Sequence, residues 1–184
     1  MIYLIIGPSN SGKTTLVYNT FVRDSKVVEC YRDIVKVTKT DASYIIGDFT
    51  GESRRKGTDT LARADIKYIY DEVRKLVDSG LDIVLEGVRV CSRPLINQLM
   101  LLGELRLIYL YCDVDLSIKR NLAYDKDSNV SFRAMKAAYT TANNIYEEYK
   151  YTIPNVKIDT SNVDFSEFSL AGVSYSVAHK SKLW

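Results

Sequence analysis

The sequence predicts an α/β domain in which helices lie on both faces of a mostly parallel, five-stranded sheet. Three observations predict this fold class. Short apolar runs typical of buried parallel strands recur along the chain. Segments with apolar residues at helical spacing separate them, and this alternation is typical of three-layer domains. The chain has 184 residues, 46% of them hydrophobic, which is enough for one domain (1–184) with a substantial core.

The first predicted strand, residues 2–6, leads into a glycine-containing loop. Residues 7–15 match the phosphate-binding pattern G-x-x-x-x-G-K-[ST], and residues 14–22 after them have helical character. The backbone N–H groups expected to bind phosphate oxygens are those of Ser9, Asn10, Ser11, Gly12, Lys13, Thr14 and Thr15. Lys13 is expected to contact the terminal phosphates of ATP, and the Thr14 hydroxyl to bind Mg²⁺. A chance glycine-rich turn would not require this order of strand, loop and helix.

The next segments alternate in the same way. Residues 34–39 and 43–47 are β-branched runs around a turn, so we expect two strands, as a hairpin whose second strand joins the main sheet. Residues 49–60 are polar and basic, as loops are. A helix is expected from Leu61, capped by Asp59 or Thr60 and ended at Ser79-Gly80.

The second half of the chain supplies the remaining elements. Strands are predicted at 81–85, 105–112 and 156–158, and helices at 92–103, 116–122 and 131–151. The polar stretch between the last two helices predicts a lid over residues 121–133. The tail, residues 163–184, has a weak pattern and receives no assignment.

Two carboxylates follow predicted strands, and ligands in open α/β sheets bind at the carboxyl ends of strands. Asp48, after the strand at 43–47, is expected to orient or deprotonate an acceptor hydroxyl. Glu86, after the strand at 81–85, is expected to hold Mg²⁺ through water or to contact the acceptor. The alternatives are a turn-forming role for Asp48 and an ion pair of Glu86 with a nearby arginine, Arg89 or Arg93.

Several cations lie near these strand ends. Arg54, with Arg55 and Lys56, is expected to contact acceptor phosphates unless its loop is simply solvated. Arg89 and Arg93 follow Glu86 directly and are better placed for the same role. Arg120 and Arg133 flank the predicted lid and are candidates to contact the transferring group, with solvated helix surface as the alternative.

With these motifs in view, the chain resembles the P-loop kinases of the nucleoside and nucleotide kinase group. Three pieces carry the resemblance: the loop 7–14, Asp115-Leu116-Ser117-Ile118-Lys119-Arg120, and Ile158-Asp159-Thr160-Ser161. It implies the P-loop NTPase fold, and it assigns these pieces to the donor phosphates, the lid entry and the adenine. Mg·ATP-dependent phosphoryl transfer to an alcohol is the activity it implies.

A narrower resemblance lies in the segments 46–49, 57–61 and 85–89. They are similar to small phage-type P-loop kinases, a set that includes the 5-hydroxymethyluracil DNA kinases. This resemblance implies that Asp48, the loop Gly57–Asp59 with Asp59 as its carboxylate, and Glu86 face the acceptor. It also implies that the acceptor is a hydroxymethylated base in DNA and that the protein acts in a host cytoplasm. A free nucleoside or nucleoside monophosphate is the alternative acceptor. An ATPase or nucleotide switch without a small acceptor is the alternative activity.

Composition excludes some classes of protein. No stretch of about 18 apolar residues exists, so no membrane span is expected. Three scattered cysteines without metal-ligand spacing favour a reducing compartment such as the cytoplasm. A net charge of +2 neither requires nor excludes nucleic acid as a partner, and the oligomeric state stays open.

Overall fold

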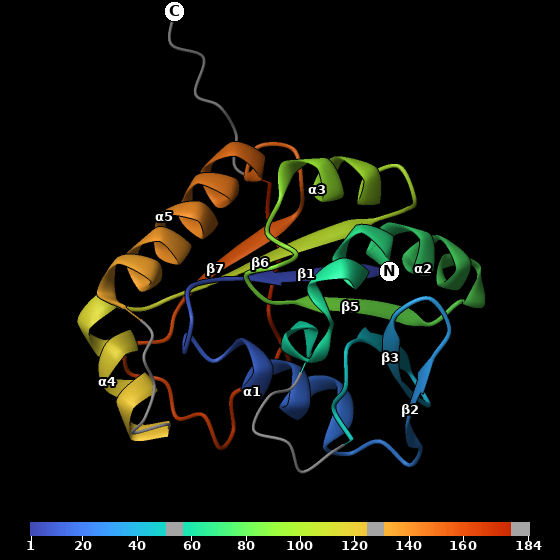
Figure 1. Cartoon of the computed structure of the whole chain (residues 1–184), viewed down its shortest axis with the longest axis horizontal. Coiled ribbons are helices and arrows are strands. Elements are labelled where there is room, and N and C mark those ends of the chain that lie inside the picture. The colour runs from blue at the N-terminus through green and yellow to red at the C-terminus, as the bar shows by residue number, and fades with distance from the viewer. Residues whose placement is uncertain (51–56, 125–130, 178–184) are drawn as a thin grey trace, which may run out of the picture.

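The computed structural model describes residues 1–50, 57–124 and 131–177, and it has three layers (Figure 1). The strands are β1 (Ile2–Ile6), β2 (Val28–Arg32), β3 (Lys36–Thr40), β4 (Ser43–Ile46), β5 (Asp82–Glu86), β6 (Leu105–Tyr111) and β7 (Asn155–Asp159). The α-helices are α1 (Lys13–Val17), α2 (Ile69–Leu76), α3 (Arg93–Leu99), α4 (Val114–Tyr124) and α5 (Phe132–Tyr149). The predicted α/β class with a mostly parallel sheet is confirmed.

The predicted number of strands is wrong, because the described residues form one seven-stranded sheet in the order β2-β3-β4-β5-β1-β6-β7. The five strands from β4 to β7 in this order are parallel, while β2 and β3 add an antiparallel extension at one edge. The predicted hairpin is confirmed as β3 and β4. Strand β2 escapes prediction because its residues, Val-Glu-Cys-Tyr-Arg, are exposed or half-buried and therefore show no apolar run.

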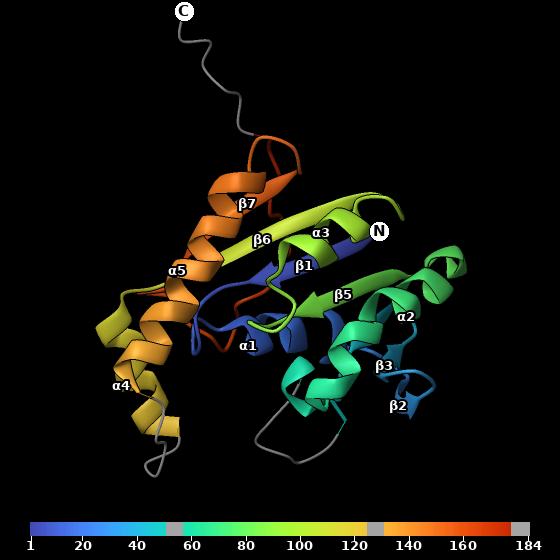
Figure 2. The same cartoon turned by 45° about the horizontal axis from the view of Figure 1, so that its top comes forward.

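Alternation along β1 divides the core into two layers. Ile2, Leu4 and Ile6 belong to the core that lies under α2, α3 and α5. Ile5 points to the opposite face and packs with Leu16 and other residues of the core beside α1. Figure 1 shows the same division, with α1 below the central strands and α2 and α3 above them, and the turned view of Figure 2 brings α2, α3 and α5 in front of the strands.

Two predicted helices differ from the structure. The helix over 14–22 is an α-helix only to Val17, and residues Tyr18–Val22 continue it as a π-helix. The helix expected from Leu61 begins as an α-helix only at Ile69, because Leu61 is extended and residues Arg63–Tyr68 form a 3₁₀ helix. The predicted cap is therefore wrong: Asp59 and Thr60 lie inside a separate 3₁₀ turn, Thr58–Thr60. Gly80 ends this region in the left-handed conformation, as predicted.

The C-terminal segment, defined here as residues 163–177, covers the α1 side of the sheet. Phe168, Leu170 and Tyr175 pack against the core beside α1, and Figure 1 shows this red segment passing on that side of the sheet. The segment closes against β7 through paired backbone bonds between Asn155 and Ser176. It therefore takes the place that a second helix would have on this face.

Two further expectations concern the lid and the membrane. Of the lid predicted over 121–133, residues 125–130 lie outside the described residues, while residues 121–124 end α4 and residues 132–133 begin α5. None of the helices in the described ranges is long and apolar enough to span a membrane.

Candidate functional site

The loop after β1 has the backbone shape of a phosphate-binding loop. Asn10 and Gly12 adopt left-handed conformations, with φ of 59° and 88°, between residues of the opposite hand. Such alternation turns successive N–H groups toward one concave side, and helix α1 begins at the next residue, Lys13. The first N–H groups of a helix have no partner within it, so they are available to an anion.

Helix α4 fastens the outer side of this loop. The Ser117 hydroxyl donates to the Ser9 carbonyl at 2.5 Å, and the Asn10 side-chain amide donates to Asn121 at 3.1 Å. Because α4 follows β6, these bonds tie the loop to the neighbouring strand as well as to its own. Two side-chain hydrogen bonds thus hold the loop against helix α4.

Lys13 is a buried cation, 7% exposed. Its Nζ donates to the Pro8 carbonyl at 2.6 Å, which folds the side chain back along the loop. Burial lowers the pKa of Lys13, and the nearby Glu86 carboxylate opposes that change. A buried cation of this kind gains from any anion that approaches, because the attraction is strong where water is excluded.

Glu86 ends β5 beside the loop and is 3% exposed. The Thr14 hydroxyl donates to its Oε1 at 3.4 Å. Burial raises the pKa of Glu86 to about 7, while the Lys13 charge lowers it. Gly57 packs directly on this carboxyl, since a Cβ at Gly57 would overlap Glu86 Oε1. The site therefore holds a carboxyl group whose charge changes near neutral pH.

The donor set suits Mg²⁺ bound together with phosphate. No group of three or more His, Cys, Asp or Glu residues that could hold a metal occurs in the part of the chain that the structure describes. Mg²⁺ in phosphoryl-transfer sites is held by few protein oxygens and completes its shell with water and phosphate oxygens. The Thr14 hydroxyl and the Glu86 carboxyl, which lie in contact, are such a pair.

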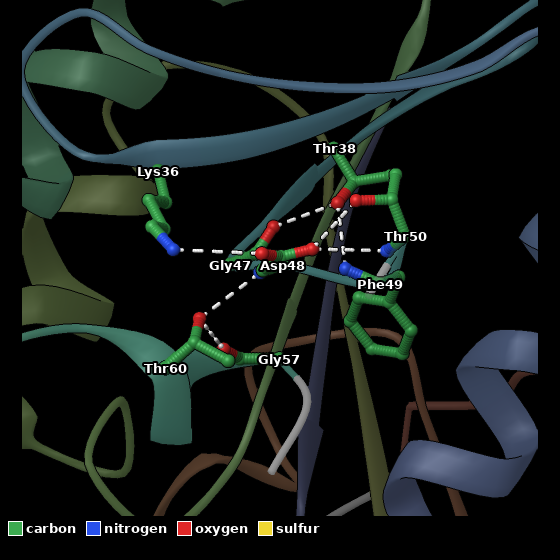
Figure 3. A network of polar contacts seen from close by, with 8 residues as sticks. All are labelled: Lys36, Thr38, Gly47, Asp48, Phe49, Thr50, Gly57 and Thr60. Carbon is green, nitrogen blue, oxygen red and sulfur yellow. Dashed lines mark hydrogen bonds and ion pairs between the residues drawn. The ribbon is translucent and has the colours of Figure 1, made fainter. Parts of the chain in front are cut away.

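Asp48 lies at the end of β4, in a network of polar contacts shown in Figure 3. Its Oδ1 accepts two bonds from Thr50, one from the backbone N–H and one from the hydroxyl, both at 2.9 Å. Its Oδ2 lies 3.5 Å from Lys36 Nζ, and the side chain is 22% exposed. The turn-forming alternative is therefore correct as a description of Oδ1, and Oδ2 faces Lys36.

The turn Gly57–Thr60 connects the two carboxylates. The Gly57 N–H donates to the Asp48 carbonyl, and the Asp48 N–H donates to the Thr60 hydroxyl. From the same turn, the Thr58 hydroxyl donates to the Glu86 carbonyl at 2.7 Å. The ends of β4 and β5 are thus joined through one short stretch of chain.

The predicted arginines are divided between several places. Arg89 donates to the Leu61 carbonyl at 2.7 Å and lies 3.9 Å from Asp59, which is exposed. Arg93 pairs with Glu148 of α5 at 2.6 Å. An ion pair of Glu86 with either arginine is therefore wrong as an alternative. Arg54 lies outside the described residues.

Arg120 is held at the outer end of the phosphate loop. Its Nη2 donates to the Thr160 carbonyl at 2.6 Å, and its guanidinium lies 4.7 Å from the centre of the Phe165 ring. Its Nη1 is buried without a hydrogen-bond partner among the described residues. A buried N–H group without a partner beside the loop can donate a hydrogen bond to an anion that binds there.

A groove of about 360 Å³ lies between the start of α3 and the middle of α5. Its lining residues are Cys91, Ser92, Arg93, Pro94, Thr141, Asn144 and Ile145. Burial raises the pKa of Cys91 to about 11 and the Lys13 charge lowers it, so this end of the groove lies within electrostatic reach of the phosphate loop. The groove starts beyond the carboxyl end of β5, where ligands bind in open α/β sheets.

Sequence reasoning missed three residues of the site. Ser117 lies within a quoted motif, but its bond to the loop has no signal in the sequence. Lys36 contacts Asp48 across the β3–β4 hairpin. An exact prediction of how these two strands pair would have found this contact. Phe165 belongs to the unassigned tail, and its contacts with Gly12 and Arg120 join distant parts of the chain.

Comparison with known proteins identifies the fold. No protein-family model and no curated protein matches the sequence. Among solved structures, deoxyadenosine kinase from M. mycoides with products dCMP and dCDP bound matches with a TM-score of 0.51 and 13% identity, over 90% of this chain and 93% of that one. The same enzyme with dCTP bound has a TM-score of 0.48 and 11% identity, over 91% and 95%. The chain therefore has the fold of a P-loop kinase.

Proposed function

We propose that this protein is an ATP-dependent kinase that transfers the γ-phosphoryl group to a hydroxyl of a nucleoside or nucleotide. The observation that carries the proposal is the convergence of three groups at one edge of the sheet. Lys13 and Thr14 begin α1, and the Glu86 carboxyl lies 3.4 Å from the Thr14 hydroxyl. Asp48, on the adjacent strand, is linked to this cluster through Gly57 and Thr58.

The donor side follows from charge and hydrogen bonding. The loop amides and Lys13 bind the β- and γ-phosphates of ATP. The Thr14 hydroxyl, with Glu86 directly or through water, holds Mg²⁺, which supplies neutralisation of charge on the phosphate oxygens. The unpartnered Nη1 of Arg120 is a donor for the transferring group. Each of these groups stabilises negative charge, which is the main requirement of phosphoryl transfer.

The acceptor side is assigned to Asp48. Its Oδ1 accepts two bonds from Thr50, and we assign proton acceptance to Oδ2, which lies 3.5 Å from Lys36 Nζ. The acceptor hydroxyl gives its proton to this oxygen as its own oxygen bonds to the γ-phosphorus, and the bond to the β-phosphate oxygen breaks. The Lys36 ammonium lies 3.5 Å from Oδ2 and places a positive charge beside it.

A free nucleoside or nucleotide is our first choice of acceptor. The fold comparison supports it, because the deoxyadenosine kinase of M. mycoides binds dCMP as a product. The groove between α3 and α5 supports it too, since its volume suits one small ligand and it offers Ser92, Arg93 and Asn144 as polar partners. Arg89 and Asp59 stand beside the Asp48 turn and are proposed to border the same ligand. A hydroxymethylated base in DNA is the second candidate and rests on the sequence resemblance alone.

A labelling experiment that offers free nucleosides, free nucleotides and an oligonucleotide separates these candidates. Purified protein is incubated with Mg·[γ-³²P]ATP and, separately, with deoxynucleosides, deoxynucleoside monophosphates and an oligonucleotide containing hydroxymethyluracil. We expect label on a free deoxynucleoside or its monophosphate. Label only on the oligonucleotide would reverse our order of acceptors. Release of labelled phosphate at the same rate with and without acceptors would replace the kinase with an ATPase.

A further inference from the structure

We propose that Phe165 is a positioning residue for the phosphate loop, and that its ring holds the Gly12 end of the loop in the shape that receives ATP. The inference rests on the proposed function, because it assigns a role in binding the donor nucleotide. It also gives a function to the C-terminal segment, for which the sequence shows no pattern.

The first support is the contact between Phe165 and Gly12. Gly12 has a φ of 88°, which residues with side chains rarely adopt. The aromatic ring lies so close that a Cβ added at Gly12 would overlap it. Gly12 is therefore fixed from both sides: its conformation needs a glycine, and the ring fills the space that a side chain would take.

The second support is the way the ring itself is held. The Arg120 guanidinium stacks on it at 4.7 Å, and the Phe168 ring meets it at 5.8 Å with its edge. Arg120 is in turn anchored to the Thr160 carbonyl, just after β7. The ring is thus placed between the phosphate loop and helix α4, which already fastens Ser9 and Asn10 on the loop's outer side.

The third support comes from the helix that the loop begins. The side-chain amide of Asn19 donates to the carbonyls of Phe165 and Phe168, both at 2.9 Å. Arg23, one turn later, donates to the Ser166 carbonyl at 2.7 Å. The main chain that carries the ring is therefore attached to the same helix whose N-terminus faces the phosphates.

These contacts lower the cost of ordering the loop when ATP binds. A loop that is already fixed by its neighbours loses less conformational freedom on binding, and this difference appears as affinity. Phe165 does not have to touch the nucleotide for this effect. Leu170 provides the contrast within the same segment, because it packs on the core beside α1 and its N–H binds the Thr20 hydroxyl.

The test compares Phe165→Ala with the matched control Leu170→Ala. Binding of Mg·ATP is measured by calorimetry, together with the KM for ATP, kcat and the melting temperature. For Phe165→Ala we expect the Kd and the KM for ATP to rise about tenfold, with a smaller fall in kcat, because Arg120 keeps its bond to the Thr160 carbonyl. For Leu170→Ala we expect a lower melting temperature and an unchanged Kd for ATP. Phe165→Leu, which keeps most of the apolar volume, replaces the alanine variant if that variant does not fold.

Two results would overturn the inference by itself. One is wild-type affinity for ATP in Phe165→Ala. The other is a loss of ATP affinity in Leu170→Ala as large as that in Phe165→Ala, because Phe165 would then act only through general stability. A wild-type protein that binds no Mg·ATP would instead remove the proposed function, and this inference with it.

Discussion

Glu86 and Asp48 stand at the ends of neighbouring strands, β5 and β4, yet they lie in different environments. Glu86 is buried at 3% exposure against Thr14 and within reach of the Lys13 charge. Asp48 is partly open, with one oxygen in a turn with Thr50 and the other facing Lys36. The difference teaches that equivalent positions on neighbouring strands can differ in burial and charge, and the proposed function accordingly gives Glu86 the metal side and Asp48 the acceptor side.

Removal of the cation on the donor side should have the largest effect. Lys13→Met keeps the length of the apolar stem but removes the charge and the bond to Pro8. Because the proposed function makes this buried charge the contact to the terminal phosphates, we expect transfer to fall by a factor on the order of 10³ or more. Rates of label transfer check this, and circular dichroism verifies the fold. Wild-type turnover in a folded variant would mean that the loop does not bind the donor.

Asp48→Asn should have the next largest effect. If Oδ2 accepts the proton of the acceptor, turnover falls by roughly 10²–10⁴-fold while ATP affinity stays the same. Thr50→Val is the matched control, since it removes the hydroxyl bond to Oδ1 and leaves the carboxylate in place. Steady-state kinetics of both variants distinguish the roles. Equal, small losses in the two variants would assign Asp48 to the turn alone.

Glu86→Gln should produce a smaller effect, on stability and its pH dependence. The pKa of Glu86 is raised to about 7 from 4.5, so the folded state keeps a proton that the unfolded state releases in this range. The contribution of Glu86 to wild-type stability therefore falls as pH rises between these values. As the pH rises from 4.5 to 8, we expect the free energy of unfolding of Glu86→Gln to increase by roughly 1–3 kcal/mol relative to that of the wild type.

Denaturant unfolding at both pH values measures this difference. A constant difference across the range would show that Glu86 is ionised in the folded protein throughout. In the same variant we expect Mg²⁺ to strengthen ATP binding less than in the wild type, because an amide is a poorer ligand for Mg²⁺ than a carboxylate. Wild-type Mg²⁺ dependence in this variant would remove Glu86 from the metal side.

The parts of the site that follow from local pattern could be predicted, and those that depend on long-range contacts could not. The loop 7–15 and the buried strand that brings Glu86 to the edge of the sheet come from short stretches of sequence, and the structure has both, with Glu86 as the last residue of β5. The exposed strand β2 has no apolar alternation to predict it. The spacing of apolar residues favours an α-helix before Ile69, where the structure has a 3₁₀ helix instead. These failures reflect tertiary context that overrides local preference.

The contacts of the C-terminal segment show the same limit more clearly. The ring of Phe165 meets Gly12 and Arg120 only because β7 ends beside β6 and returns the chain to the loop. The partners of Arg89 and Arg93 depend in the same way on where the turn Thr58–Thr60 and helix α5 fall. The rule that ligands bind at the carboxyl ends of strands predicts the edge of the sheet at which such residues lie. It does not predict their contacts, which depend on tertiary packing.

Titration of Mg·ATP into the wild-type protein and Lys13→Met tests the central claim most directly, because the whole arrangement is built around a bound triphosphate. We expect saturable binding to the wild type and binding at least about tenfold weaker to Lys13→Met. Absence of binding to the wild type at millimolar-scale nucleotide, or equal binding to both proteins, would contradict the account.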